Sequence, residues 1–316
     1  MGNCCKKKTE ETGPGARKNL NAQGGYTKIA DGQHTGSIKE GSMGTMISAQ
    51  DPEAGKILEG NPNAPFVASI VPNMLDAECI GIINQLKLEE VLNSVKEKTA
   101  KINREDLKMI SDAKDTFKLY FDVKTDEQKE KFHTTVMETK YARMGPLAYK
   151  IANSMIPEDV ELKLSSNYEK FATVFRAKIG DVYYIMNYAL YKKILLFNKK
   201  DLLFLKAFKE FEDGDVAEVT VSIQHSKYPE VKGTDRMKII DNFVYYKKTG
   251  DTSVETISFS SLYPRVGGTF GMLSSLFAKS YRTFVKALAE YMDTVSKTPK
   301  ELEEEFKQFV SLPNTA

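Results

Sequence analysis

The stretch LSSLFAKSYRTFVKALAEYMDTV (273–295) decides the fold more than any other part of the chain. Its apolar residues recur every three to four positions, and several of them are aromatic, as at Phe277, Tyr281 and Phe284. Charged residues fall on the opposite side. This period predicts one long amphipathic helix with an aromatic stripe. The stripe either packs as ordinary core or forms the wall of a cavity.

The segments before this helix are typical of strands, because they are rich in β-branched and aromatic residues. Most of them follow one another across short polar turns, for example at Gly180 and Gly250, so consecutive strands should pair antiparallel. Regular alternation would place Ile239 and Phe243 on one face, towards the last helix. The predicted strands cover residues 117–123, 131–142, 168–179, 181–190, 201–211, 216–226, 236–248 and 253–263.

Helical spacing is found at both ends of the strand-rich region. Residues 74–97 have apolar positions at approximately helical intervals. A second helix is expected after Asn103, with Leu107, Ile110 and Ala113 on one side. Two short helices are expected in MGPLAYKIANSM (144–155) and in TPKELEEEFKQFV (298–310).

This order of elements resembles the START lipid-transfer domain, over roughly residues 75–295. Three motifs carry the resemblance in its second half: KKDLLFL (199–205), SKYPEVKGTDR (226–236) and PRVGGTFGMLSSLF (264–277). The resemblance implies an α+β class and the helix-grip fold, in which a curved antiparallel β-sheet wraps around the long C-terminal helix, with N-terminal helices. The expected domains are a disordered tether (1–64), a START-like lipid-binding domain (65–296) and a short helical tail (297–316).

The chain also departs from the family. Phe117-Lys118 stands where the family commonly has Trp-Lys, and the chain has no Trp. The acid and arginine of sterol-binding members align near Asn187 and Lys206, so that charge pair is not reproduced. The ligand is therefore left open between a sterol, a phospholipid, a sphingolipid or another lipid.

The resemblance implies one lipid in an apolar cavity closed by the last helix. Lys206 interrupts the apolar run LLFLKAF, and its ammonium either reaches water or meets a lipid headgroup, since a buried ammonium needs an anionic partner. The residues expected to contact the lipid are Tyr183, Asn187, Lys206, Phe243, Phe277, Tyr281, Phe284 and Leu288.

The segment YKKILLFNKK (191–200) lies where the family has a loop that gates the cavity and touches membranes. Apolar residues between lysines suit a membrane interface with anionic headgroups. The alternative is a strand edge whose apolar residues are buried. The expected docking residues are Ile194, Leu195, Leu196 and Phe197.

The N-terminal sequence MGNCCKKK (1–8) predicts lipid anchoring. Gly2 suits myristoylation, and Cys4 and Cys5 suit palmitoylation, although Lys6 stands where Ser or Thr is usual. One myristoyl chain binds a membrane only marginally, so a second chain decides whether the anchor is stable. Lys6, Lys7 and Lys8 would add attraction to anionic lipids. The alternative is an ordinary disordered start.

The remaining composition narrows the function. A net charge of +2 argues against a nucleic-acid binder, and Cys79 as the only cysteine beyond the N-terminus leaves no intramolecular disulfide framework. No motif of a catalytic, metal or cofactor site is present. We expect a non-enzymatic protein without metal or cofactor, anchored on the cytoplasmic face of a membrane, that binds or transfers one lipid. The alternatives are a tethered scaffold without ligand and a helix-grip enzyme for an apolar substrate.

Overall fold

The computed structural model describes residues 75–113, 117–165, 167–193, 198–263 and 270–308. All of them belong to one compact unit of the chain. Within these ranges no helix combines the length and the apolar character that crossing a membrane would require.

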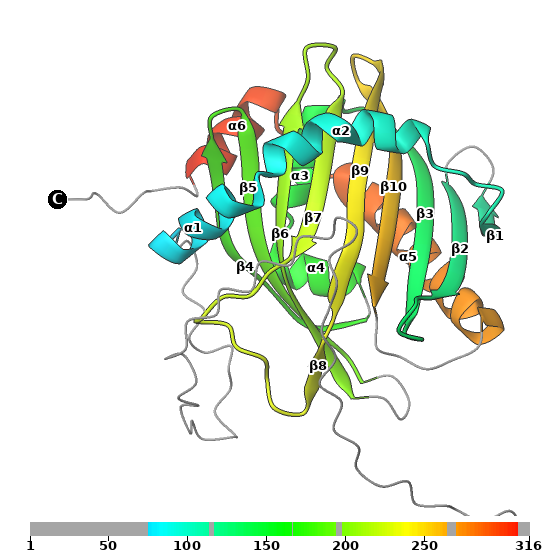
Figure 1. Cartoon of the computed structure of the whole chain (residues 1–316). Coiled ribbons are helices and arrows are strands. Elements are labelled where there is room, and N and C mark those ends of the chain that lie inside the picture. Colours follow the sequence, from blue (N-terminus) through cyan, green and yellow to red (C-terminus); the bar gives the residue numbers. More distant parts are fainter. Residues whose placement is uncertain (1–74, 114–116, 166, 194–197, 264–269, 309–316) are drawn as a thin grey trace, which may run out of the picture. The chain divides into compact units, whose positions relative to one another are not determined.

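One large antiparallel sheet forms the body of the described unit (Figure 1). Its strand order is β1-β2-β3-β10-β9-β7-β6-β5-β4, and the short β8 pairs in parallel with β6. The strands are β1 (Lys108–Ala113), β2 (Phe117–Thr125), β3 (Lys131–Ala142), β4 (Tyr168–Ile179), β5 (Val182–Tyr191), β6 (Lys199–Glu210), β7 (Val216–Ser222), β8 (Thr234–Arg236), β9 (Lys238–Gly250) and β10 (Ser253–Tyr263).

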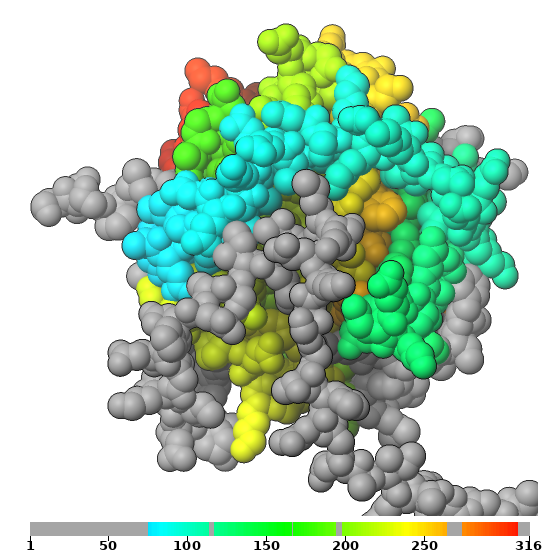
Figure 2. Space-filling model, viewed as in Figure 1, coloured from blue at the N-terminus to red at the C-terminus, as the bar shows by residue number. Residues whose placement is uncertain are grey.

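Helices cover both faces of this sheet. On one face, which we call the outer face, α2 packs against β6, β7 and β9, and Figure 2 shows α1 and α2 as a band across the strands. On the other, inner face, α5 packs against β1, β2, α3 and α4. The helices are α1 (Ala77–Leu86), α2 (Leu88–Ala100), α3 (Pro146–Ser154), α4 (Glu158–Leu164), α5 (Phe270–Met292) and α6 (Pro299–Gln308).

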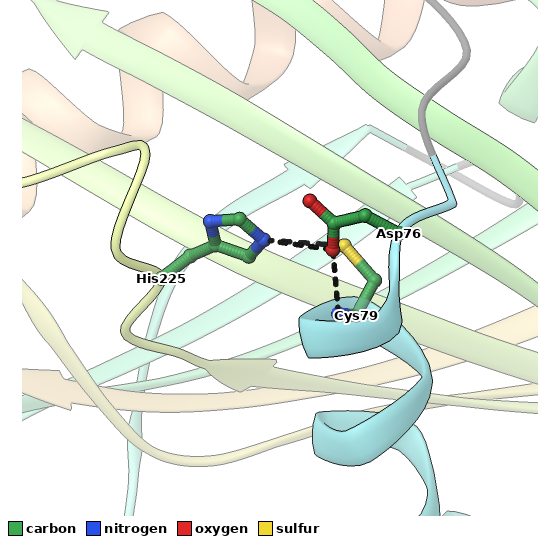
Figure 3. A group of neighbouring side chains, drawn as sticks. All are labelled: Asp76, Cys79 and His225. Atoms are coloured by element: carbon green, nitrogen blue, oxygen red, sulfur yellow. Dashed lines mark hydrogen bonds and ion pairs between the residues drawn. The ribbon is translucent and has the colours of Figure 1, made fainter.

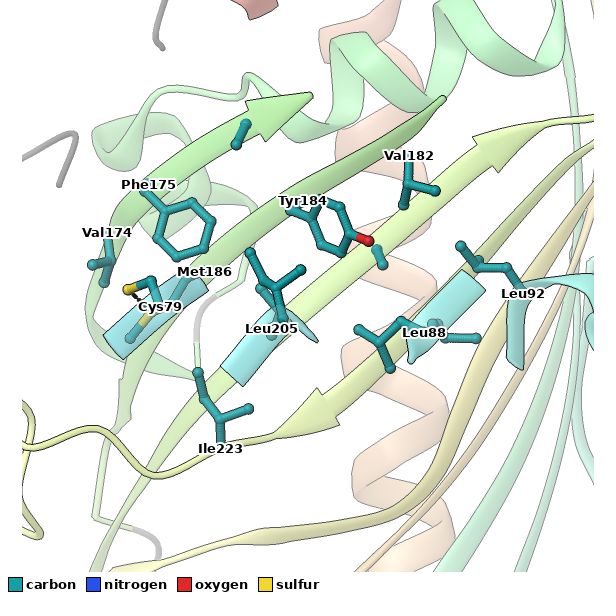
Figure 4. Close-up of a cluster of buried hydrophobic side chains, with 14 of the residues drawn as sticks. Cys79, Leu88, Leu92, Val174, Phe175, Val182, Tyr184, Met186, Leu205 and Ile223 are labelled. Carbon is teal, nitrogen blue, oxygen red and sulfur yellow. Dashed lines mark hydrogen bonds between the residues drawn. The ribbon is translucent and has the colours of Figure 1, made fainter. Parts of the chain in front are cut away.

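Each face has its own apolar core. The outer core joins α1 and α2 to the sheet through residues such as Leu92 and Phe175 (Figure 4). The inner core joins α3, α5 and α6 to the sheet, with Phe208 and Phe306 fully buried. Central strands such as β5 are therefore buried along almost their whole length.

The helix-grip α+β class expected from the sequence is confirmed: a curved, open antiparallel sheet carries helices and a long C-terminal helix. Three strands were predicted at their observed bounds, namely β3, β4 and β10. The reason is that long alternating segments between clear turns leave little choice of register.

The helix expected after Asn103 was wrong. Residues Lys108–Ala113 form the strand β1, which pairs antiparallel with β2. Six residues are too few for helical spacing to be distinctive, and pairing with a neighbouring strand overrides local propensity. The long N-terminal helix is also interrupted, at Lys87, whose backbone is left-handed with φ 45°.

Two of the sequence motifs meet in the fold. Asp201 of the first motif, on β6, lies against Arg236 of the second, on β8, with 2.8 Å between Arg236 Nη2 and Asp201 Oδ2. Arg236 also donates to the backbone carbonyl oxygens of Tyr228 and Pro229. This buried ion pair fixes the parallel pairing of β8 with β6, and it explains why the two motifs occur together.

Candidate functional site

A cavity of about 310 Å³ lies between the inner face of the sheet and α5. Its α5 side is mostly apolar, because Tyr281, Phe284 and Leu288 recur at helical spacing on one side of the helix. Strands β3, β6, β7, β9 and β10 line the opposite wall, and residues of α3 close one end. The sheet side contributes Met137, Thr139, Leu202, Phe204, Lys206, Glu218, Thr220, Ile239, Asn242, Val244, Tyr246, Thr256, Ser258, Ser260 and Leu262.

Short hydroxyl side chains line much of the β10 wall. Alternate residues of a strand point to opposite faces, so Thr256, Ser258 and Ser260 face the cavity, while Phe259 stacks on Phe243 at 5.1 Å on the outer face. Thr256 and Thr139 hydroxyls lie 2.6 Å apart. The cavity wall is therefore amphipathic, with hydroxyls on the sheet and an apolar stripe on α5.

A charged cluster occupies one end of this cavity. Lys150 Nζ on α3 lies 3.0 Å from Glu218 Oε2 on β7, and both side chains are almost completely buried. Tyr246 donates its hydroxyl to the same carboxylate at 2.6 Å. Lys206 Nζ lies farther away, 3.9 Å from Glu218 Oε1. The carboxylate of Glu218 thus lies close to two ammonium groups.

Burial and charge act against each other in this cluster. Burial lowers the pKa of Lys150 to about 8, although Glu218 opposes the shift. Burial alone would raise the pKa of Glu218, but Lys150 and Lys206 outweigh it and keep this pKa below its ordinary value. Burial raises the pKa of Glu161 on α4, and the same two lysines oppose that shift. Two lysines and two carboxyl groups therefore influence one another around this end of the cavity.

A second pocket of about 30 Å³ adjoins the polar end, and Lys206 and Asn153 line both spaces. Its wall includes Asn187 and Glu161. Among the described residues, the side-chain oxygen of Asn187 is buried without a hydrogen-bond partner. The volume is about that of one water molecule, roughly 30 Å³.

Four of the residues expected to contact a lipid line the large cavity: Lys206, Tyr281, Phe284 and Leu288. Asn187 lines the adjoining small pocket. Phe277 lies nearer the start of α5, where its ring packs on Phe121 at 5.0 Å and on His133 at 5.5 Å.

Tyr183 and Phe243 do not line the cavity. Tyr183 lies at the end of β5 that α6 covers, stacks on Phe208 and donates its hydroxyl to Glu303. Phe243 faces α2 in the outer core, contrary to the expected direction. The reason is a β-bulge: Leu262 pairs with Ile239 and Ser261 with Asp241, so Ile240 is an extra residue that reverses the alternation.

The expected lipidation residues Gly2, Cys4 and Cys5 and the lysines Lys6, Lys7 and Lys8 lie outside the described residues. The same holds for the expected docking residues Ile194, Leu195, Leu196 and Phe197. Their roles stay predictions.

Sequence reasoning missed Lys150 and Glu218. Each is a single charge in an apolar segment, the same signal that drew attention to Lys206. Their partnership was not visible, because it depends on α3 lying over β7.

A separate group of titratable side chains lies at the start of α1 (Figure 3). His225 Nε2 lies 3.4 Å from both Asp76 Oδ1 and Cys79 Sγ. Asp76 caps the helix by accepting from the backbone N–H of Cys79, and Lys227 pairs with its other oxygen at 2.6 Å. The backbone N–H of Lys227 donates to His225 Nδ1, which leaves the ring proton on Nε2. This arrangement fits a clamp between α1 and the β7–β8 connection better than a metal site.

No protein-family model matches the sequence, and no curated protein matches it. Among solved structures, human STARD10 has a TM-score of 0.53 at 14% identity, covering 70% of this chain and 89% of its own. Human StAR-related lipid transfer protein 5 has a TM-score of 0.50 at 13% identity, covering 65% of this chain and 94% of its own. At these identities the likeness concerns the fold alone, and the chain has the helix-grip fold of these two structures.

Proposed function

We propose that this protein binds one lipid in the cavity between the sheet and α5, and carries it at or between membranes. The observation that carries the proposal is the cavity itself, about 310 Å³ under an amphipathic helix. Cavities of this size that combine an apolar surface, here on α5, with polar groups are typical of small-ligand sites. The two solved structures with the same fold are described as STARD10 and a StAR-related lipid transfer protein, which is consistent with this proposal.

The ligand would enter by movement of α5. The second half of this helix is anchored, because Leu288 and Met292 are buried in the inner core. Nearer its start, Leu276 is 45% exposed and Phe277 is only partly buried. Opening at the start of α5 would uncover the cavity, at the cost of the contacts that Phe277 makes with Phe121 and His133.

Membrane anchoring completes the proposal. Acylation at Gly2, Cys4 and Cys5 would hold the protein on a cytoplasmic membrane face, and the segment Ile194–Phe197 would touch the bilayer during exchange. We propose binding and transport rather than catalysis: the buried carboxylate at the cavity, Glu218, is held by Lys150 and by the Tyr246 hydroxyl.

A cavity-filling substitution tests the ligand site. Ser258 faces the cavity from β10, so Ser258→Phe should occupy part of its volume and reduce lipid binding at least tenfold. The matched control is Thr283→Phe on the exposed side of α5, which should leave lipid binding unchanged. Retention of fluorescent fatty acid by both full-length variants is the measurement. Equal retention would rule out this cavity as the lipid site.

A further inference from the structure

The length of the cavity bears on the ligand. On β10 the lining residues extend from Leu262 to Thr256, which is ~20 Å at ~3.4 Å per residue. A cavity of about 310 Å³ with this length suits a hydrocarbon chain that lies along β10.

The two ends of the cavity differ in polarity. One end, near Tyr191 at the end of β5, is lined by Leu202, Ile239 and Leu262 together with the rings of Tyr168 and Tyr191. The other end, beside α3, is lined by Lys206 and Glu218. A chain with one polar end would therefore lie with that end beside α3 and with its hydrocarbon along α5.

At the polar end, Glu218 has its hydrogen-bond partners, whereas the ammonium of Lys206 has no acceptor in the described structure. Glu218 is already contacted by Lys150, by the hydroxyl of Tyr246 and by the hydroxyl of Thr220 at 3.4 Å. An ammonium has three donors, but within the described parts of the chain Lys206 has no hydrogen-bond acceptor. Its nearest carboxylate oxygen is the one 3.9 Å away on Glu218.

The charges around Lys206 favour an anion there. Lys150 and Lys206 share Glu218, and Glu161 makes no ion pair within 4.0 Å with either lysine in the described structure. The Lys206 side chain is 27% exposed and its nearest carboxylate oxygen lies 3.9 Å away, so an incoming anion would form a charge-assisted hydrogen bond with its ammonium. A cationic head would instead be repelled by both lysines.

We propose that the ligand is a lipid with an anionic head, a carboxylate or a phosphate, which Lys206 binds inside the cavity. This assignment rests on the proposed lipid-binding function and narrows it to one class of ligand. Lys150 binds Glu218 at 3.0 Å, whereas Lys206 stays 3.9 Å from the same carboxylate and forms no hydrogen bond with it.

Matched ligands of one chain length test the charge preference. Dodecanoate, dodecyl phosphate, dodecanol and dodecylamine are titrated into the delipidated full-length protein, and inorganic phosphate is titrated alone. A charge-assisted hydrogen bond should make the two anions bind about tenfold or more tightly than the alcohol. The amine should bind more weakly than the alcohol, and phosphate without a chain should not compete at millimolar concentration.

Two substitutions test whether Lys206 causes the preference for an anionic head. Lys206→Met should abolish the difference between acid and alcohol while leaving the alcohol bound, and Lys206→Arg should keep the difference. Equal binding of acid and alcohol to the unmodified protein, or an unchanged preference in Lys206→Met, would overturn the assignment but not the proposed function. If none of the chain-bearing ligands binds, the proposed function fails as well.

Discussion

At the scale of single residues, His133 is the most unusual buried group. It lies on β3 between Phe121 and Phe277, is 2% exposed, and neither ring nitrogen has a hydrogen-bond partner in the described structure. Burial lowers the pKa of His133 from 6.5 to about 4. The imidazole is therefore kept neutral by its apolar surroundings and not by a partner.

This histidine should make the protein sensitive to acid. Because its pKa is lower in the folded state, the unfolded state binds the proton first, and stability falls as the pH falls from 6.5 to 4. The full loss is about 3 kcal/mol. His133→Phe should flatten this part of the pH profile, measured by urea unfolding at each pH.

Other groups make both the unmodified protein and His133→Phe less stable in acid. The difference between the pH profiles of their unfolding free energies therefore isolates the contribution of His133. Asp76 and Glu303, for example, have lowered pKa values and also lose stabilising interactions in acid. Parallel profiles for the unmodified protein and His133→Phe would show that His133 is not the origin.

The face on which a residue lies could be predicted only in helices and strands that keep a regular period. Tyr281, Phe284 and Leu288 were found because a helix of this length keeps its period. Phe243 was misplaced because a single extra residue, Ile240, reverses the alternation of β9. No local pattern in a single sequence predicts such a bulge.

At the scale of elements, β8 is attached to β6 by parallel strand pairing, by the Lys200–Asp235 ion pair and by the buried Asp201–Arg236 ion pair. Asp201→Asn leaves the guanidinium of Arg236 buried without its counter-charge, which should cost about 3–5 kcal/mol. The exposed Glu230→Gln in the same connection is the matched control and should change stability little. Chemical unfolding of both variants gives the two values. A loss below 1 kcal/mol for Asp201→Asn would contradict the account.

Helix α6 behaves as a part of the folded unit in this structure. Phe306 is fully buried against Tyr183 and Phe208, and Glu303 pairs with Lys178 on β4. Phe306→Ala should therefore cost about 3–5 kcal/mol of unfolding free energy. Glu304→Ala on the exposed side of the same helix is the control. Equal stability of the two variants would mean that α6 does not pack as described.

The element order was largely predictable from sequence, whereas the short elements were not. Strands β3, β4 and β10 are long segments rich in β-branched and aromatic residues, with turn residues on both sides. The seven-residue α4 and the three-residue β8 have no pattern of their own. Their positions follow from tertiary contacts, of which the Asp201–Arg236 pair is an example.

At the scale of the whole molecule, we propose that a lipid-binding cavity is combined with an N-terminal membrane anchor. Gly2→Ala should move the protein from the membrane to the soluble fraction, because without myristate the adjacent cysteines are poor substrates for stable acylation. Cys4→Ser with Cys5→Ser should leave only weak attachment. Cell fractionation at physiological salt distinguishes these outcomes. If both variants remain with membranes, acylation is not the anchor.

The central claim is that the space under α5 holds one lipid. Native mass spectrometry of the full-length protein, purified without detergent after exposure to cell membranes, tests this claim most directly. We predict a stoichiometric adduct of one lipid per chain that Ser258→Phe removes and Thr283→Phe retains. A protein that shows no adduct before or after membrane exposure, in all three forms, would contradict the claim.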